Sequence, residues 1–221
     1  MTDNDSNLKS KIDIFKWLTI FNTVAVFSII AFLGYMFFIS RKAPSADAQQ
    51  AQAKQIDMGQ LTQGAPFSGP ENAKVSIVMF NSFTCGFCKK VSPVLNQVLQ
   101  KYPDKVRLVY RHFIRNEVDL AAANATECAG EQNKFWQMHD QIFAENGGEF
   151  NYKLYARNIG INLAQFDACV ASNKYSQKAR SDSEMGQYLG VQGTPTFVIN
   201  GELVVGYRPF EAFDAVVKQS L

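Results

Sequence analysis

The pattern of apolar and polar positions predicts alternating strands and helices in the second part of the chain. Residues 74–80 are almost continuously apolar, as in a buried strand, and the apolar residues of 89–101 recur with a helical period. Residues 105–113 alternate apolar and more polar side chains, which predicts a second strand. Strand, helix and strand over this length predict a right-handed parallel crossover.

A long helical segment follows, and a hairpin and a helix close the chain. Residues 117–189 have helical periodicity throughout, with apolar stripes that we interpret as core. Residues 196–200 and 202–206 predict two strands joined at Asn200-Gly201, a pair typical of type I′ turns. Residues 210–221 are apolar along one side of a final helix. The order β-α-β, helical block, β-β-α predicts an α/β fold.

The N-terminal part has a different pattern. Residues 17–39 contain no charged side chain, and as a helix about 34 Å long they would cross a bilayer core of about 30 Å. We predict one transmembrane anchor there, with residues 1–16 in the cytoplasm because three lysines precede the span and only two basic residues follow it. A cleavable signal peptide is the alternative, although its apolar stretch usually has only about 7–15 residues.

Residues 40–65 are rich in alanine, glutamine and small polar residues, which predicts a linker. An oligomerising helix is the alternative, but no sustained apolar heptad supports it. We place the folded domain at residues 66–221, with the helical insertion at about 117–189.

Composition excludes several classes of function. The chain has 221 residues and a formal net charge of +2, with no concentrated basic patch, which argues against binding to nucleic acid. It has no glycine-rich phosphate loop, nucleotide fingerprint or G-x-S-x-G elbow. The only two histidines, His112 and His139, lack metal-ligand spacing to a cysteine. We therefore predict no metal and no cofactor.

Candidate chemistry lies at Cys85-Gly86-Phe87-Cys88, where the first strand meets the first helix. Two thiols at this spacing can share a short disulfide ring, and a thiol at a helix N-terminus is stabilised as the reactive thiolate. C-x-x-C between a strand and a helix predicts redox chemistry of thiols. Half of a zinc site is an alternative, but structural zinc needs a second close pair of ligands, which the sequence lacks. Two incidental core cysteines are the other alternative.

The element order and several motifs resemble the DsbA-like branch of thioredoxin-fold oxidoreductases, which act outside the bacterial cytoplasm. The resemblance covers residues 66–221 and implies a thioredoxin fold with an inserted all-helical subdomain. The segments that carry it are Phe83–Lys89, Val109–Phe113, Glu127–Glu131 with Phe135-Trp136, and Gly193–Phe197.

The resemblance implies roles for four residues. Cys85 would be the attacking cysteine, which forms a mixed disulfide with the substrate, and Cys88 the buried resolving one. Thr194-Pro195 matches the cis proline beside the dithiol, and the backbone of Thr194 would pair with a substrate peptide. An ordinary trans proline at a strand entry is the alternative.

Other side chains have two interpretations each. Phe87, with Phe83 and Phe197, either forms an apolar substrate surface or packs in the core. Cys128 and Cys169 either form a structural disulfide, as in some relatives, or stay free and buried.

The chain departs from its relatives at two places. Many relatives have a buried acidic residue six positions before the first cysteine, where this chain has Met79. Strongly oxidising relatives have Pro-His between the cysteines, where this chain has Gly86-Phe87. A histidine places positive charge near the thiolate and a phenylalanine does not, so we expect a less oxidising enzyme, closer to isomerase-type relatives.

Together these observations predict an enzyme, a membrane-anchored thiol–disulfide oxidoreductase that forms or exchanges disulfides in exported proteins. It would be a single-pass protein of the cytoplasmic membrane, with its C-terminal domain on the extracytoplasmic side. Its predicted partners are cysteine-containing exported proteins, a membrane redox protein and the membrane itself. The alternatives are an isomerase or reductase kept reduced by a membrane partner, a non-catalytic chaperone or binding module, and a C-x-x-C metal carrier.

Overall fold

The computed structural model describes residues 26–37, 56–145 and 149–221. The chain divides into two compact units, Met1–Ala53 and Lys54–Leu221. In the first unit, residues 26–37 form a helix with exposed apolar side chains. Across the described ranges, no helix combines the length and the apolar character needed to span a membrane. The rest of the predicted anchor at 17–39, the predicted N-terminus at 1–16 and residues 40–55 of the predicted linker lie outside the described residues.

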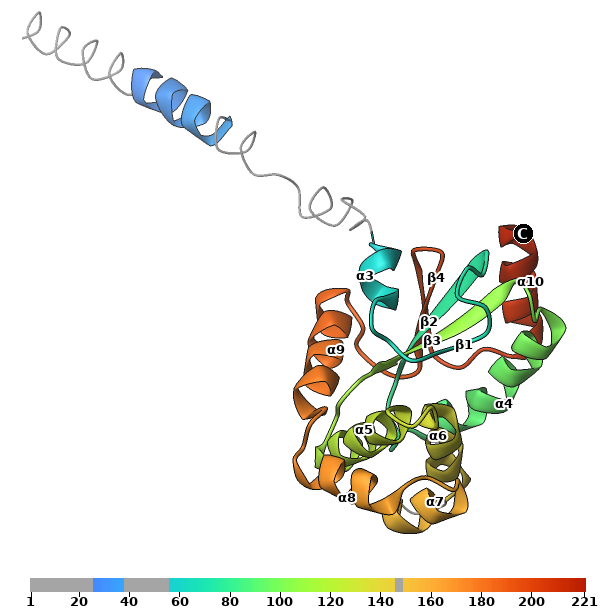
Figure 1. Cartoon of the computed structure of the whole chain (residues 1–221). Coiled ribbons are helices and arrows are strands. Elements are labelled where there is room, and N and C mark those ends of the chain that lie inside the picture. Colours follow the sequence, from blue (N-terminus) through green and yellow to red (C-terminus); the bar gives the residue numbers. More distant parts are fainter. Residues whose placement is uncertain (1–25, 38–55, 146–148) are drawn as a thin grey trace, which may run out of the picture. The chain divides into compact units, whose positions relative to one another are not determined.

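The second unit contains the elements of an α/β fold (Figure 1). Its sheet has the order β1-β3-β2-β4-β5, in which β2 and β3 are parallel and the other neighbouring pairs are antiparallel. The parallel pair, with a helix between its strands, is the crossover that the sequence predicted. The elements, in chain order, are α3 (Met58–Thr62), β1 (Phe67–Ser68), β2 (Val75–Asn81), α4 (Gly86–Lys101), β3 (Val106–His112), α5 (Glu117–Gly130), α6 (Phe135–Ala144), α7 (Tyr152–Asn158), α8 (Leu163–Ala171), α9 (Ser176–Tyr188), β4 (Thr196–Ile199), β5 (Glu202–Val205) and α10 (Phe210–Ser220).

Helices cover both faces of the sheet, because successive side chains of its buried strands point to opposite faces. Ile77 and Met79 of β2 belong to the larger core, which also receives side chains from α4, α10 and the helical block. Val78 and Phe80 belong to a second core with residues of α3 and α9. Figure 1 shows α9 on the opposite side of the sheet from α4 and α10.

Gly186 lets α9 approach the sheet closely. A Cβ atom added there would come within 2.9 Å of the ring of Phe80 and 3.2 Å of the ring of Phe113. Both rings are buried, so a larger residue at this position would push the helix off the sheet.

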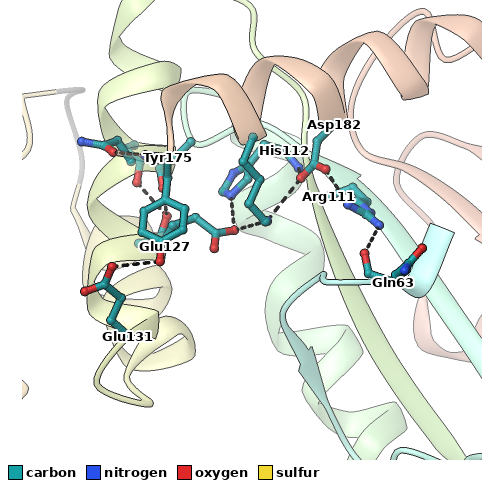
Figure 2. A network of polar contacts seen from close by, with 12 residues as sticks. Gln63, Arg111, His112, Glu127, Glu131, Tyr175 and Asp182 are labelled. Atoms are coloured by element: carbon teal, nitrogen blue, oxygen red, sulfur yellow. Dashed lines mark hydrogen bonds and ion pairs between the residues drawn. The ribbon is translucent and has the colours of Figure 1, made fainter. Parts of the chain in front are cut away.

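The packed unit begins before residue 66, which differs from the sequence prediction. Residues 56–65, which we expected in the linker, include α3, whose Leu61 is buried in the second core. The buried Arg111 of β3 donates hydrogen bonds to the carbonyl oxygens of Gln60, Leu61 and Gln63. Its guanidinium also pairs with the buried Asp182 of α9 at 2.5 Å (Figure 2). A strand residue and a helix residue distant in sequence thus hold this segment, which local composition alone does not reveal.

Between β3 and β4, where the sequence predicted a helical insertion, the described residues form the helices α5 to α9. Helix α5 is buried along most of its length and packs against α6, α8 and α9. A disulfide bond between Cys128 and Cys169 joins α5 to α8, with a Cα–Cα distance of 5.8 Å. This is the pair that the sequence singled out as a candidate disulfide.

The β4–β5 hairpin turns at the predicted Asn200-Gly201. Both residues have positive φ angles, 51° and 91°, as a type I′ turn requires. The hairpin extends the sheet beyond β4 and leaves β5 as an edge strand.

Candidate active site

The two cysteines of the C-x-x-C pair lie at the start of α4, just beyond the end of β2. Cys85 is the N-cap residue of the helix and Cys88 lies in its first turn. Strand β2 is buried and its side chains belong to the core, so the sheet fixes the position at which the helix begins. This placement matches the strand–helix junction that the sequence predicted.

A buried carboxylate fixes the loop between β2 and Cys85. Asp119 of α5 accepts hydrogen bonds at 2.9 Å from the Ser82 hydroxyl and from the Thr84 backbone N–H. It also accepts from the backbone N–H of Arg115, and the Asn116 side chain caps the helix that carries it. The inserted helices therefore position the loop that presents Cys85. Sequence reasoning missed Asp119, because only its place at a helix start was visible there.

The loop before β4, which is distant in sequence from the C-x-x-C pair, completes the site. The Thr194-Pro195 peptide bond is cis. When protonated, the Cys85 thiol donates a hydrogen bond to the Thr194 carbonyl oxygen at 3.2 Å, across 109 positions of sequence. The backbone N–H of Gly206 donates to the Pro195 carbonyl at 2.8 Å, which ties this loop to the end of β5. The structure thus brings together the four residues whose roles the resemblance implied: Cys85, Cys88, Thr194 and Pro195.

The environment of Cys85 favours its ionised form. A hydrogen bond from Cys88 lowers the pKa of Cys85 to about 5, helped by the Thr194 side chain and by backbone N–H groups at the helix start, while burial opposes the shift. At neutral pH the group is therefore a thiolate, which is the nucleophile in disulfide exchange.

Cys88 has the opposite character. Its side chain is fully buried, and burial, followed by the hydrogen bond to Cys85, raises the pKa of Cys88 far above the usual value. One sulfur of the pair is thus a thiolate at the start of the helix, and the other is a protonated thiol inside the core. This asymmetry is what a two-step exchange reaction needs, because only one sulfur reacts first.

Of the three phenylalanines with two interpretations in the sequence, only Phe87 is exposed. The Phe87 side chain is 62% exposed, between the two cysteines. Phe83 and Phe197 are buried, which agrees with the alternative interpretation of core packing for these two. Phe83 stacks in an aromatic cluster with Tyr110 and Phe143, and Phe197 packs edge-on against a ring of α10.

Each of the two histidines contacts a carboxylate. His112 contacts the Glu127 carboxylate at 3.1 Å, and His139 contacts the Asp140 carboxylate at 2.9 Å. Both rings are buried. Within residues 26–37, 56–145 and 149–221, no group of three or more His, Cys, Asp or Glu side chains is placed to hold a metal ion.

Comparison with known proteins shows the family to which the chain belongs. A family model described as thioredoxin matches residues 61–219. Among curated proteins, the chain is 32% identical over 154 residues to Na(+)/H(+) antiporter NhaA 1 of Salinispora arenicola, which covers 67% of this chain and 24% of that protein. It is 27% identical to Na(+)/H(+) antiporter NhaA of Herminiimonas arsenicoxydans, over 69% of this chain and 25% of that protein. The chain thus spans about a quarter of the length of these curated relatives.

Solved structures with the same fold include a thioredoxin-like oxidoreductase and a thiol–disulfide exchange protein. A thioredoxin-like oxidoreductase from Silicibacter pomeroyi superposes with a TM-score of 0.68 at 25% identity, covering 75% of this chain and 98% of that one. The thiol-disulfide exchange protein alpha-DsbA2 from Wolbachia pipientis gives a TM-score of 0.69 at 23% identity, covering 80% and 99%. BdbD from Bacillus subtilis gives 0.65 at 18% identity, covering 71% and 92%.

Proposed function

The chain belongs to the thioredoxin family, and from that premise we propose that it is a protein thiol–disulfide oxidoreductase that uses Cys85 and Cys88. The observation that carries this proposal is the electrostatic asymmetry of the pair. Cys85 is a thiolate at the N-terminus of α4, next to the cis Thr194-Pro195 bond, and Cys88 is a buried thiol in the first turn of the same helix. A structural zinc pair or two incidental core cysteines would not need this difference in pKa.

The exchange follows from thiolate chemistry. With the pair oxidised, a substrate thiolate attacks the Cys85 sulfur, the Cys85–Cys88 bond breaks, and Cys88 leaves as a thiolate that takes up a proton. A second substrate thiolate then attacks the substrate sulfur of the mixed disulfide. The substrate disulfide forms and Cys85 departs as a thiolate, so two electrons have passed from the substrate to the enzyme. The same steps in reverse reduce or rearrange a substrate disulfide.

The low pKa of Cys85 supports the direction of disulfide formation. A stabilised thiolate favours the reduced enzyme, which makes the enzyme disulfide a stronger oxidant. From the sequence, the phenylalanine between the cysteines predicted a weaker oxidant. The second candidate function is therefore an isomerase or reductase that a membrane partner keeps reduced. The redox state of the pair in cells distinguishes the two, because an oxidase is held oxidised and an isomerase is held reduced.

We place this activity outside the cytoplasm, in a domain anchored to the cytoplasmic membrane by residues 17–39. Two observations support this placement. The predicted anchor contains no charged residue, and the Cys128–Cys169 disulfide suits an oxidising compartment. Exported proteins with free cysteines would be the substrates, and a membrane redox protein would regenerate the enzyme.

The test is substitution of each reactive cysteine in the full chain, followed by thiol trapping in cells. Cys85→Ser should abolish exchange, and Cys88→Ser should accumulate mixed disulfides that reductant releases. The matched control is Cys128→Ser with Cys169→Ser, which removes the other disulfide and keeps the reactive pair. Full exchange activity in Cys85→Ser would refute the function, and suppression of aggregation without both reactive cysteines would favour a chaperone.

A further inference from the structure

The exchange reaction requires a proton to reach and leave Cys88 inside the core. Cys88 is fully buried, and Met79, the residue of β2 beside Tyr110 in the sheet, offers no polar atom that titrates. A group other than a carboxylate on this strand must therefore carry the proton. The aromatic cluster between the sheet and α6 contains two polar atoms that suit this task.

The first atom is the hydroxyl oxygen of Tyr110. The side chain is completely buried, and within the part of the chain that the structure describes its hydroxyl has no hydrogen-bond partner. Burial raises the pKa of Tyr110 well above its usual value, and a negative charge on Cys88 would raise it further. The Tyr110 hydroxyl is thus neutral and holds its proton, and Tyr110 and Cys88 belong to the same buried core.

The second atom is Nε2 of His139 on α6. The His139 ring packs edge-on against the Tyr110 ring, with centroids 5.5 Å apart. Burial lowers the pKa of His139, so the ring is neutral. In the neutral form, Nδ1–H donates to Asp140 at 2.9 Å, which makes Nε2 an acceptor. Nε2 is buried and likewise has no partner among the described residues.

A cavity of about 200 Å³ lies beside this cluster, between α4 and α6. His139, Asp140 and Met79 line it, together with Ser92 and Asn96 of α4. Ser92 lies one helical turn after Cys88. A polar cavity of this size has room for several bridging waters, which is how proteins satisfy buried donors and acceptors. The Asp140 side chain is 61% exposed, so the cavity lining extends from a buried imidazole to an exposed carboxylate.

We propose that Tyr110 and His139 form the proton path between Cys88 and this cavity, which deepens the proposed function and rests on it. When Cys88 resolves a mixed disulfide, its S–H bond breaks and its sulfur bonds to Cys85. The substrate sulfur leaves with the electron pair. Tyr110 takes the Cys88 proton and passes its own to His139 Nε2 through cavity water, and the imidazole returns a proton to the cavity. Both residues are positioning residues, because neither touches the substrate.

The other titratable groups around the path already form hydrogen bonds or take part in the reaction itself. Cys85 is the reaction partner at the helix start. The charges that act on Tyr110 or His139 from β3, α5 and α9 are His112, Asp119, Glu127 and Asp182. His112 bonds to Glu127, Asp119 to the loop before Cys85, and Asp182 to Arg111. Within this group of titratable residues, the Tyr110 hydroxyl is the donor, and His139 Nε2 the acceptor, that have no hydrogen-bond partner among the described residues.

The experiment follows the two chemical steps separately in the reduced full chain. A small disulfide such as oxidised glutathione is mixed with enzyme between about pH 5.5 and 8.5, and formation and resolution of the mixed disulfide are quantified by acid quench and mass analysis. Tyr110→Phe and His139→Phe keep the ring packing and remove the polar atoms. Resolution should slow about 100-fold or more in each variant, because general acid–base catalysis contributes about 10²- to 10⁴-fold. Attack by Cys85 should keep its wild-type rate.

Phe143→Leu is the matched control. This ring packs on His139 with centroids 4.7 Å apart, so the change disturbs the same cluster and removes no polar atom. Resolution at the wild-type rate in either Tyr110→Phe or His139→Phe, or an equal loss in Phe143→Leu, would overturn the path. If a variant does not fold, the path is tested in the wild-type protein by its solvent deuterium isotope effect. A solvent deuterium isotope effect must then be larger on resolution than on attack, and equal effects refute the path. Wild-type enzyme that forms no mixed disulfide would refute the proposed function instead.

Discussion

Acidification from pH 7 to pH 6 should leave the alkylation rate of Cys85 almost unchanged. With a pKa of about 5, about 99% of the group is thiolate at pH 7 and about 90% at pH 6. An unperturbed cysteine thiol, with a pKa of 9.0, loses about nine tenths of its small thiolate population over the same interval. The slope of the pH profile therefore reports the pKa directly.

The absolute rate at pH 7 is a weaker test. The thiolate population rises about 100-fold when the pKa falls from 9.0 to about 5, but intrinsic nucleophilicity falls about 60-fold with a Brønsted slope of about 0.45. The net gain is only about twofold at pH 7, and it grows to about 15-fold at pH 6. An assay at neutral pH alone would therefore miss the effect.

The assay is pseudo-first-order alkylation of the reduced protein with iodoacetamide from about pH 4 to 9, with intact-mass detection. Cys88→Ala is the informative variant, because the hydrogen bond from Cys88 is the largest cause of the low pKa. Its profile should move to higher pH. The denatured wild-type protein supplies the unperturbed profile. A wild-type midpoint above about pH 7, or a Cys88→Ala profile identical to wild type, would refute the electrostatic account of the site.

The same pKa sets how the stability of the reduced protein depends on pH. The thiolate stabilises the folded reduced state fully above the pKa of the unfolded thiol, and this contribution is lost as the pH falls through about 5. The oxidised protein has no thiolate at this position. The difference in unfolding free energy between reduced and oxidised protein should therefore shift towards the reduced form as the pH rises from about 5 to 9, and a pH-independent difference would contradict the low pKa.

Three further changes have expected outcomes. Asp182→Asn leaves a buried guanidinium unpaired, so urea unfolding should show a loss of about 3–5 kcal/mol, whereas Asp167→Asn at an exposed pair should lose at most about 1 kcal/mol; equal losses would be inconsistent with burial as the cause. Replacing Cys128 and Cys169 by alanine opens a closure of 41 residues and should lower stability by roughly 4 kcal/mol, while the alkylation profile of the reactive thiolate stays the same; an altered profile would mean that this disulfide also tunes the site. Phe87→Ser removes an exposed apolar ring and should raise KM for unfolded protein substrates but not for a small disulfide; an unchanged KM for both would exclude a role in substrate binding.

Local patterns predicted the elements that carry the reactive pair. The apolar run before Cys85 and the helical period after it require only neighbouring residues, and they correspond to β2 and α4. The Asn200-Gly201 turn was predictable for the same reason, since its dihedral angles depend on two side chains. These features needed no knowledge of what packs against them.

Features that depend on distant partners were not predictable in this way. The burial of Phe83 and Phe197 comes from rings of the helical block and α10 that meet them only in the folded domain. Asp119 became visible as a support for the active-site loop only through its hydrogen bonds to that loop in the folded domain. The attachment of α3 depends on Arg111, which in sequence is a polar residue of an ordinary alternating strand.

The long separation between Cys85 and Thr194 has a consequence for a chain that is made from its N-terminus onwards. The C-x-x-C pair emerges first, and the residue that accepts its hydrogen bond follows 109 positions later. At synthesis rates of about 5–20 residues per second, this interval lasts roughly 5–20 s. Strand β4 also lies between β2 and β5 in the sheet, so the sheet stays incomplete until then. The newly made chain therefore carries both thiols before β4 and the Thr194-Pro195 loop complete the site around them.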